Sequence, residues 1–165
     1  MIGIFYGSTT GTTETVARDI AAKLGVGAED VHDVARAGAA DAMRYDVLLL
    51  GSSTWGSGEL QDDWYGFLDA LKRLDLSGKK VALFGCGDGA SYPDTFCDAI
   101  GLIYDGLAGT GCTFIGAYWP EGYDVTDSLV ARNGQFVGLA IDETDGADKT
   151  AAREEAWVAQ LKGEM

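Results

Sequence analysis

Short apolar runs alternate with helical patterns along this chain, and that alternation restricts the fold more than any other feature of the sequence. The runs fall at residues 2–6 (IGIFY), 47–50 (VLLL), 81–85 (VALFG) and 113–119 (TFIGAYW), with a weaker one near 31–34. Between them, apolar side chains recur at spacings of three and four, as on one face of a helix. Strands that alternate with helices predict an α/β fold, a parallel sheet covered on both faces by helices.

Four segments carry an apolar helical face, and we expect a helix in each. The last of them is expected to begin with Asp148 or Thr150 as its N-cap. The apolar positions are Val16, Ala17, Ile20, Ala21 and Leu24; Trp64, Phe67, Leu68 and Leu71; Phe96, Ile100, Ile103 and Leu107; and Trp157, Val158 and Leu161. A chain of 165 residues is long enough for one hydrophobic core, so we expect a single domain over residues 1–165.

Composition excludes several classes of protein. A formal net charge of −14 is unfavourable for nucleic-acid binding, because phosphates need basic contacts. The same charge fits a solubilising surface or a basic protein partner. No apolar run is long enough to span a membrane, and the start MIGIFYG has no signal-peptide pattern, so we expect a cytoplasmic protein. The three cysteines lack metal-ligand spacing and favour buried apolar positions.

A loop rich in hydroxyl groups follows the first apolar run. It reads GSTTGTTE, from Gly7 to Glu14, and leads directly into the first helical pattern. Backbone N–H groups and the dipole at a helix N-terminus attract anions, and hydroxyls add neutral donors. The loop lacks the Gly-Lys-Ser/Thr of a P-loop and the glycine spacing of a dinucleotide site. It therefore fits either a phosphate site or a Ser/Thr-rich turn with a helix cap.

Aromatic residues lie among glycines in two further loops that follow strands. Trp55 lies in GSSTWGSGELQDDW (51–64), and Tyr92 lies in GCGDGASYPDTF (85–96). Parallel sheets bind ligands at the carboxyl ends of their strands, near the point where strand order reverses. One such aromatic could simply fold back on the core. Two of them beside a phosphate site favour a planar ring held between them.

These motifs, in this order, resemble the flavodoxins, small FMN-binding electron carriers, over essentially the full length. The matching stretches are GSTTGTTE, TWGSGELQDDW and GDGASYPDTFCDAIG. PEGYDVTDSLVARNGQFVGLAID (120–142) resembles the insertion that splits the fifth strand in the long-chain subgroup, with FVGLAID returning to the sheet. Thr95 departs from the family pattern, which often has asparagine there. The resemblance implies a doubly wound five-stranded parallel sheet in the order 2-1-3-4-5.

The resemblance also implies FMN as the cofactor, bound without a covalent link. Its phosphate is expected on the hydroxyl loop and its isoalloxazine ring between Trp55 and Tyr92, with Asp142 or Asp145 near the ribityl chain. The residues implied to contact FMN are Ser8, Thr9, Thr10, Gly11, Thr12, Thr13, Ser53, Thr54, Trp55, Gly56, Gly58, Cys86, Gly87, Asp88, Tyr92, Phe96 and Asp142. In the family, the peptide corresponding to Gly56–Ser57 turns when the flavin takes its first electron.

Charge in these loops indicates how the protein tunes its cofactor. Lys and Arg are absent from residues 45–71 and 81–131, which carry acidic residues that include Glu59, Asp62 and Asp88. Nearby carboxylates disfavour an anionic reduced flavin, so its second electron becomes strongly reducing. This predicts a low-potential one-electron carrier that shuttles between semiquinone and hydroquinone. Its expected partners are basic redox proteins such as a ferredoxin–NADP reductase-type enzyme or nitrogenase reductase, and we expect a monomer.

No set of residues in the sequence indicates catalysis or a metal site. The sole histidine, His32, lies near the weak second strand, away from the three loops, and is expected at the surface.

A flavin-dependent quinone reductase shares the predicted fold and cofactor, but it needs an open pocket over the ring. A response-regulator-like domain needs acidic residues where this chain has GST and GSS. A purely structural domain would bind no flavin. The sequence favours an electron-transfer protein over an enzyme.

Overall fold

The structure is a computed structural model that describes residues 1–55, 58–123 and 128–165. Strands and helices alternate along most of the chain, as the apolar pattern predicts. The strands are β1 (Ile2–Gly7), β2 (Val31–Asp33), β3 (Val47–Trp55), β4 (Glu59–Leu60), β5 (Lys80–Gly87), β6 (Thr113–Ile115), β7 (Ala131–Arg132), β8 (Gln135–Phe136) and β9 (Leu139–Asp142). The α-helices are α1 (Thr12–Leu24), α2 (Asp63–Leu71), α3 (Asp98–Leu107) and α4 (Ala147–Glu164), and short 3₁₀ helices cover Ala28–Asp30, Ala39–Arg44 and Pro93–Thr95.

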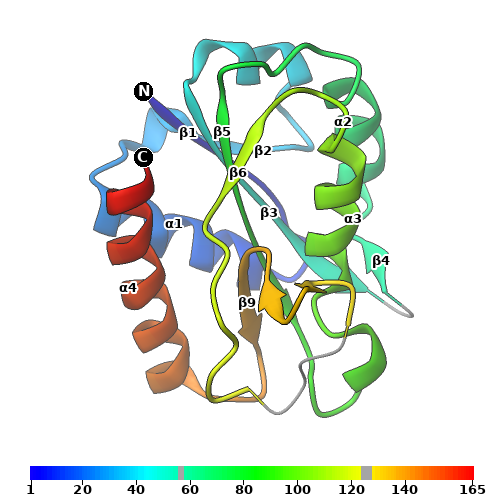
Figure 1. Cartoon of the computed structure of the whole chain (residues 1–165), viewed down its shortest axis with the longest axis vertical. Helices are drawn as coiled ribbons and strands as arrows, with labels where there is room; N and C mark the ends of the chain where they lie inside the picture. The colour runs from blue at the N-terminus through cyan, green and yellow to red at the C-terminus, as the bar shows by residue number, and fades with distance from the viewer. Residues whose placement is uncertain (56–57, 124–127) are drawn as a thin grey trace.

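A parallel sheet forms the centre of the molecule (Figure 1). Its strands lie in the order β2-β1-β3-β5-β6, and every neighbouring pair in that order is parallel. This is the predicted doubly wound order, with strand order reversing between β1 and β3. The short strand β4 pairs antiparallel with the end of β3.

The edge strand beside β5 is split into two pieces. The first piece, β6, pairs with Lys80–Ala82, and the second, β9, pairs with Phe84–Gly87. The predicted return of FVGLAID to the sheet is therefore confirmed. The predicted strand at 113–119 is too long, because Gly116 takes a φ of +87° and the chain leaves the sheet there. Trp119 is 63% exposed rather than buried in a strand.

Helices cover both faces of the sheet (Figure 1). Helices α1 and α4 lie on one side, and α2 and α3 lie on the other. Each pair encloses its own buried apolar cluster, one around Ile20 and Trp157 and the other around Trp64 and Ile103. The strands are apolar on both sides for this reason, since neither face of a parallel sheet meets water. Within the described residues, no helix is both long and apolar enough to cross a membrane.

Two helix starts differ from the sequence-based expectation. Helix α3 begins at Asp98 rather than at Phe96, because Cys97 adopts a left-handed φ of 53° just before it. Helix α4 begins at Ala147 after Gly146, whose φ is +86°. Asp148 and Thr150 therefore lie inside the helix, and neither is its N-cap. Glycine adopts a positive φ at lower conformational cost than any other residue, so Gly146 is a suitable residue to precede α4.

His32 is half-buried, which corrects the expectation of a surface residue. Its ring stacks on Phe5, with 4.7 Å between ring centroids. Its Nε2 lies 2.7 Å from the Tyr45 hydroxyl, which in turn donates to Asp30 Oδ1 at 2.9 Å. This group includes a residue of β2 itself, and none of its members lines the cavities at the loops described below. It joins the outer strand to the core.

Glu154 is the exception to the apolar packing between α1 and α4. It is only 2% exposed, and its Oε2 has no hydrogen-bond partner among the described residues. Burial, together with the Asp19 carboxylate and against the opposing charge of Lys23, raises the pKa of this carboxyl from 4.5 to about 7. A buried acid of this kind favours its neutral form. Glu154 therefore makes the stability of the fold depend on pH.

We predict that the free energy of unfolding falls as pH rises from about 4.5 to about 7, where the folded state keeps a proton that the unfolded state releases. Above about pH 7 the Glu154 carboxyl is ionised in both states, and the free energy of unfolding falls no further from this cause. Glu154→Gln removes this titration and should stabilise the ligand-free protein by about 1–3 kcal/mol at pH 8, with little effect at pH 5. Urea unfolding at both pH values measures the difference.

The matched control is Glu155→Gln, on the exposed side of the same helix. It should not change the difference in stability between the two pH values. A Glu154→Gln protein with the same pH dependence as the wild type would show that the buried carboxyl does not cause it.

Candidate functional site

The hydroxyl loop joins β1 to α1 at the carboxyl edge of the sheet. Gly11 turns the chain with a φ of +94°, and its N–H donates to Ser8 Oγ at 3.1 Å. Among the residues that the structure describes, no side chain caps the N-terminus of α1. The first N–H groups of the helix therefore lack a side-chain acceptor among the described residues. That arrangement suits an anion.

Thr13 is the most informative residue of the loop. It is fully buried beside the Cys86 thiol, whose pKa it lowers, and its Oγ1 makes no hydrogen bond of ordinary geometry among the described residues. A buried hydroxyl without a partner destabilises a protein by about 1–3 kcal/mol. Its position in the first turn of α1, under a loop of exposed hydroxyls, is where a bound phosphate would supply the missing acceptor. The loop thus fits the phosphate group that the sequence predicts there.

Gln61 and Trp64 support the hydroxyl loop from the neighbouring segment. Gln61 is 2% exposed and donates through Nε2 to Thr9 Oγ1 at 3.2 Å. A Cβ at Gly7 would lie 2.5 Å from Trp64 Cδ1, so the loop can follow this path only with glycine at that position. Sequence reasoning did not select Gln61 or Trp64 as site residues. Their only signal was their place in the ELQDDW segment after the second loop.

A narrow cleft separates the two aromatic residues. Trp55 and Tyr92 are 39% and 55% exposed, which is unusual for such large apolar side chains. The Trp55 indole N–H donates to Ser53 Oγ at 2.9 Å, which fixes the orientation of its ring. The cavity between them measures about 210 Å³, and it is lined by Thr54, Trp55, Gly87, Asp88, Tyr92, Thr95, Phe96 and Glu143. Its shape and aromatic walls suit a planar ring.

A second, larger cavity of about 780 Å³ adjoins the hydroxyl loop between α1 and α4. It is lined by Thr10, Gly11, Thr12, Thr15, Val16, Asp19, Ile141, Glu143, Gly146, Ala147, Thr150, Ala151 and Glu154. Glu143 lines both cavities, so they lie on either side of the loop after β9. Sequence reasoning missed Glu143. No lysine or arginine among the described residues lines either cavity.

Asp88 shapes the third loop with its own carboxylate. Its Oδ1 accepts hydrogen bonds from Ser91 N at 2.8 Å and Ala90 N at 3.1 Å. The bond from the Ser91 N–H, the largest contribution, holds the pKa of this carboxyl below its usual value. The Asp88 carbonyl also accepts from Tyr92 N at 2.9 Å. The turn therefore presents Tyr92 to the cleft and keeps a negative charge beside it.

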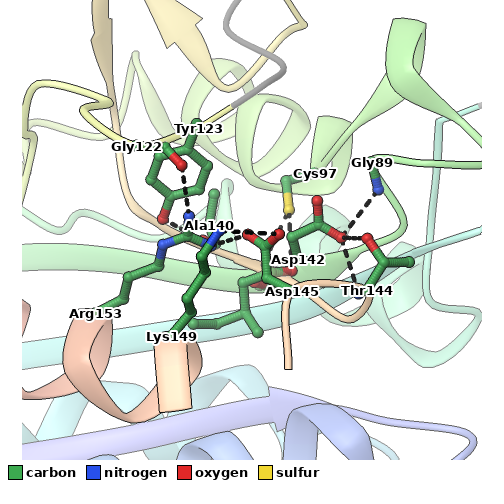
Figure 2. Close-up of polar contacts among 12 residues, drawn as sticks. Gly89, Cys97, Gly122, Tyr123, Ala140, Asp142, Thr144, Asp145, Lys149 and Arg153 are labelled. Atoms are coloured by element: carbon green, nitrogen blue, oxygen red, sulfur yellow. Dashed lines mark hydrogen bonds and ion pairs between the residues drawn. The ribbon is translucent and has the colours of Figure 1, made fainter. Parts of the chain in front are cut away.

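The two candidate carboxylates, Asp142 at the end of β9 and Asp145 just after it, have different roles (Figure 2). Asp142 Oδ1 accepts from Gly89 N at 3.2 Å and from Thr144 Oγ1 at 2.6 Å. It thereby connects β9 to the third loop. Asp145 instead binds Arg153, with 2.6 Å between its Oδ2 and Nη1, and the Arg153 guanidinium lies 3.8 Å from the centre of the Tyr123 ring. Asp142 thus holds the third loop, which forms part of the cleft, and Asp145 fixes Arg153 of α4 beside the insertion.

Some of the predicted contact residues lie in unexpected surroundings. Cys86 is fully buried between the sheet and α1, and burial raises the pKa of its thiol to about 12. Its side chain faces the core, so only its backbone is left to contact a ligand. Phe96 is 1% exposed and packs in the opposite core, yet it still lines the cleft. Gly56 and the predicted Gly56–Ser57 peptide turn lie outside the described residues.

The remaining predicted residues gather at the same edge of the sheet. Ser53, Thr54 and Gly58 lie at the end of β3 or just after it, and Gly87 ends β5. Gly58 has a φ of +93°, and its N–H donates to Trp55 O at 3.1 Å. Among the residues that the structure describes, no group of His, Cys, Asp and Glu side chains is arranged to hold a metal ion. The site is therefore built from hydroxyls, backbone groups and aromatic rings.

Known proteins match this chain in sequence. The sequence profile of the flavodoxin family matches residues 4–157. The chain belongs to the flavodoxin family. It is 47% identical to the flavodoxin of Synechococcus elongatus over 99% of this chain and 97% of the relative, and 47% identical to flavodoxin 1 of Escherichia coli K12 over 99% and 93%. The profile and these relatives confirm the predicted family; membership of the long-chain subgroup stays a prediction.

Solved flavodoxins share the fold. The Fusobacterium nucleatum flavodoxin, solved bound to flavin mononucleotide, superposes with a TM-score of 0.89 at 29% identity, over 99% of this chain and 98% of that one. A point mutant of the same protein, also bound to flavin mononucleotide, gives a TM-score of 0.90 at 30% identity over 99% and 96%. Flavodoxins are electron-transfer proteins rather than enzymes, and this confirms the predicted class.

We predict that Asp142→Ala weakens binding of FMN, the ligand of these solved relatives, by about tenfold or more. The substitution removes the acceptor that fixes Gly89, so the third loop is no longer held in place before the ligand binds, and a tenfold loss corresponds to about 1.4 kcal/mol of ordering cost. Fluorescence titration of the ligand-free protein with FMN measures the affinity.

Asp145→Ala is the matched control, since it breaks the contact with Arg153 on the far side of the same loop. It should lower the unfolding temperature but leave FMN affinity within about twofold. Equal losses of affinity in the two variants would contradict the separate roles given to these carboxylates.

Proposed function

We propose that this chain binds FMN without a covalent link and carries single electrons at low potential between other proteins. The observation that carries the proposal is the position of the Trp55–Tyr92 cleft beside the hydroxyl loop, at the carboxyl edge of the sheet. A cleft with aromatic residues in its lining, next to a loop suited to an anion, matches the two parts of flavin mononucleotide, a planar ring and a phosphate. When bound, FMN supplies the redox chemistry, and the protein supplies binding and tuning.

The hydroxyl loop holds the phosphate in this proposal. The α1 N-terminus offers uncapped N–H groups, and Thr13 offers a buried hydroxyl that lacks a partner among the described residues. These groups are neutral, so the loop can bind a phosphate without a lysine or arginine. The contacts proposed along the loop are Ser8, Thr9, Thr10, Gly11, Thr12 and Thr13.

Acidic groups around the cleft set the low potential. Asp88 and Glu143 line it, and none of its described lining residues is basic. A negative charge near the ring disfavours the anionic hydroquinone more than the neutral semiquinone, so the second electron is strongly reducing. Shuttling between those two forms is the working cycle that we propose. It follows from charge at the site, and it needs no proton-transfer residue of the protein.

The visible absorption spectrum of the purified or reconstituted protein tests the proposal most directly. Flavin bands with a stoichiometry near one FMN per chain are the expected result. A colourless protein that cannot be reconstituted would overturn it. Steady NAD(P)H-dependent quinone turnover by the pure protein would instead favour a reductase of the same fold.

We predict opposite effects of Thr13→Val on ligand-free stability and on FMN affinity. Valine has the shape of threonine without the unpartnered hydroxyl, so the ligand-free protein should be as stable as the wild type or more stable. FMN binding should weaken by about tenfold or more, because a hydrogen bond to a charged phosphate is lost. Titration with FMN and thermal unfolding measure the two quantities.

Riboflavin is the matched ligand control, since it lacks the phosphate. The affinity for riboflavin should be unchanged by Thr13→Val. Thr10, which lines the larger cavity, should behave in the same way: Thr10→Val should weaken binding of FMN but not of riboflavin. Equal losses for FMN and riboflavin would remove the phosphate role from these hydroxyls.

Charge also indicates the kind of partner. The net charge of −14, with carboxylates around an exposed cleft, suits partners with a basic surface, such as a ferredoxin–NADP reductase-type enzyme or nitrogenase reductase. We propose that the carrier acts as a monomer in the cytoplasm.

We predict that the rate of electron transfer to a basic reductase falls as ionic strength rises, since salt screens the charges that steer association. Stopped-flow kinetics between about 0.01 and 0.5 M salt measure this. A neutral acceptor such as a small quinone serves as the control and should show no comparable decrease. A reductase rate that is independent of salt would exclude electrostatic steering.

A further inference from the structure

The first turn of α3 contacts both aromatic loops of the site. Ala99 N donates to Thr54 Oγ1 at 3.1 Å, which joins the helix to the end of β3. A Cβ at Gly87 would lie 2.9 Å from Cys97 N, so the end of β5 also passes close to this turn. The position of the first turn of α3 therefore affects the end of β3, which carries Trp55, and the end of β5, which leads into the third loop.

The insertion packs along one face of the same helix. Leu129 N donates to Asp98 Oδ1 at 2.8 Å, and Arg132 forms two bonds to the Asp105 carboxylate, at 2.8 and 3.0 Å. Between them, the Leu129 carbonyl occupies the space that a side chain at Gly101 would fill. Positions 98, 101 and 105 lie on one face of an α-helix. The insertion segment 128–132 thus follows α3 from its first turn toward its end.

Asp98 joins this segment to the second loop. Its side chain is 6% exposed within the fold. A Cβ at Gly58 would lie 2.5 Å from Asp98 Oδ2 and 3.3 Å from its Cγ, so the carboxylate occupies the space beside a glycine whose φ is +93°. Gly58 N donates to Trp55 O, so the position of Gly58 is linked to the residue that forms one wall of the cleft.

We propose that Asp98 is a positioning residue that transmits the packing of the insertion to the second loop: the Leu129 N–H fixes one carboxylate oxygen, and the other oxygen packs against Gly58, which is hydrogen-bonded to Trp55. This inference rests on the proposed FMN function. It gives the insertion a role at the site although segment 128–132 does not line the cleft.

The charge on Asp98 depends on the same contacts. Burial raises the pKa of this carboxyl, while the Leu129 N–H and the Arg132 guanidinium lower it. The insertion therefore favours the ionised form of a carboxylate that it also holds in place. Asparagine at this position would keep the acceptor for Leu129 N and lose the charge. Alanine would lose both, so the two substitutions separate geometry from charge.

The test compares Asp98→Ala, Asp98→Asn and Asp105→Ala with the wild type. Asp98→Ala should weaken FMN binding by about tenfold, because Gly58 and the end of β3 are no longer held in place before the ligand binds, and binding must then order them. It should also speed amide hydrogen exchange at Leu129 and Gly58 in the ligand-free protein, and alter the separation of the two one-electron potentials of bound FMN. Asp98→Asn should restore the slow exchange and keep FMN affinity within about threefold of wild type.

Asp105→Ala is the matched control, because it breaks the other contact of the insertion with the same helix face, away from the loops. It should lower thermal stability but leave FMN affinity and the separation of the potentials unchanged. If Asp98→Ala does not fold, Asp98→Glu replaces it, since the longer side chain keeps the charge and displaces the carboxylate against Gly58. Asp98→Glu should then weaken FMN binding.

Three results would overturn the inference. They are wild-type affinity and exchange in Asp98→Ala or its replacement, equal effects of Asp98→Ala and Asp105→Ala, and failure of Asp98→Asn to restore either property. Each of these leaves the proposed FMN function intact if the wild-type protein binds FMN. A wild-type chain that binds no FMN would remove both proposals together.

Discussion

Parallel pairing of β1, β3 and β5 is the constraint on which the rest of the structure depends. Gly7 lies opposite Ser52, and Ser53 lies opposite Cys86, so the three strands end together at one edge. The loops after them therefore meet, although the chain separates them by long segments. The crossover helices that parallel strands require cover both faces of the sheet, which explains the continuous apolar runs. Register in the sheet thus creates the site.

The site departs from the local rules that the rest of the fold obeys. Thr13 has a buried hydroxyl without a described partner, Trp55 and Tyr92 expose large rings, and Asp98 buries a carboxylate. Each destabilises the ligand-free protein, and each contacts a loop or cavity at the carboxyl edge of the sheet. Such departures gather at functional sites because a ligand or a neighbouring segment compensates for them. Glu154 is a similar departure on the α1–α4 side, where it lines the larger cavity.

The insertion adds structure to the edge of the sheet and packs on α3. It leaves the sheet at Gly116 and returns with β9, so one edge position is filled by two short strands. Tyr123 joins it to the sheet through Ala140 O at 2.6 Å, and Arg153 joins it to α4. These contacts connect the insertion to elements that also hold the loops of the site. Its influence on the cleft would therefore be indirect, through helix and strand positions.

The sequence by itself determined the alternation of strands and helices, the hydroxyl and aromatic loops, and the charge around them, because apolar periodicity and residue chemistry are local properties. Only the tertiary structure decided that Asp142 binds Gly89 of the third loop while Asp145 binds Arg153, that Gln61 supports the hydroxyl loop, and that Asp98 lies against Gly58. Those facts depend on which segments meet across the sheet. Pairing and packing between residues far apart in the chain leave no periodic signal in a single sequence.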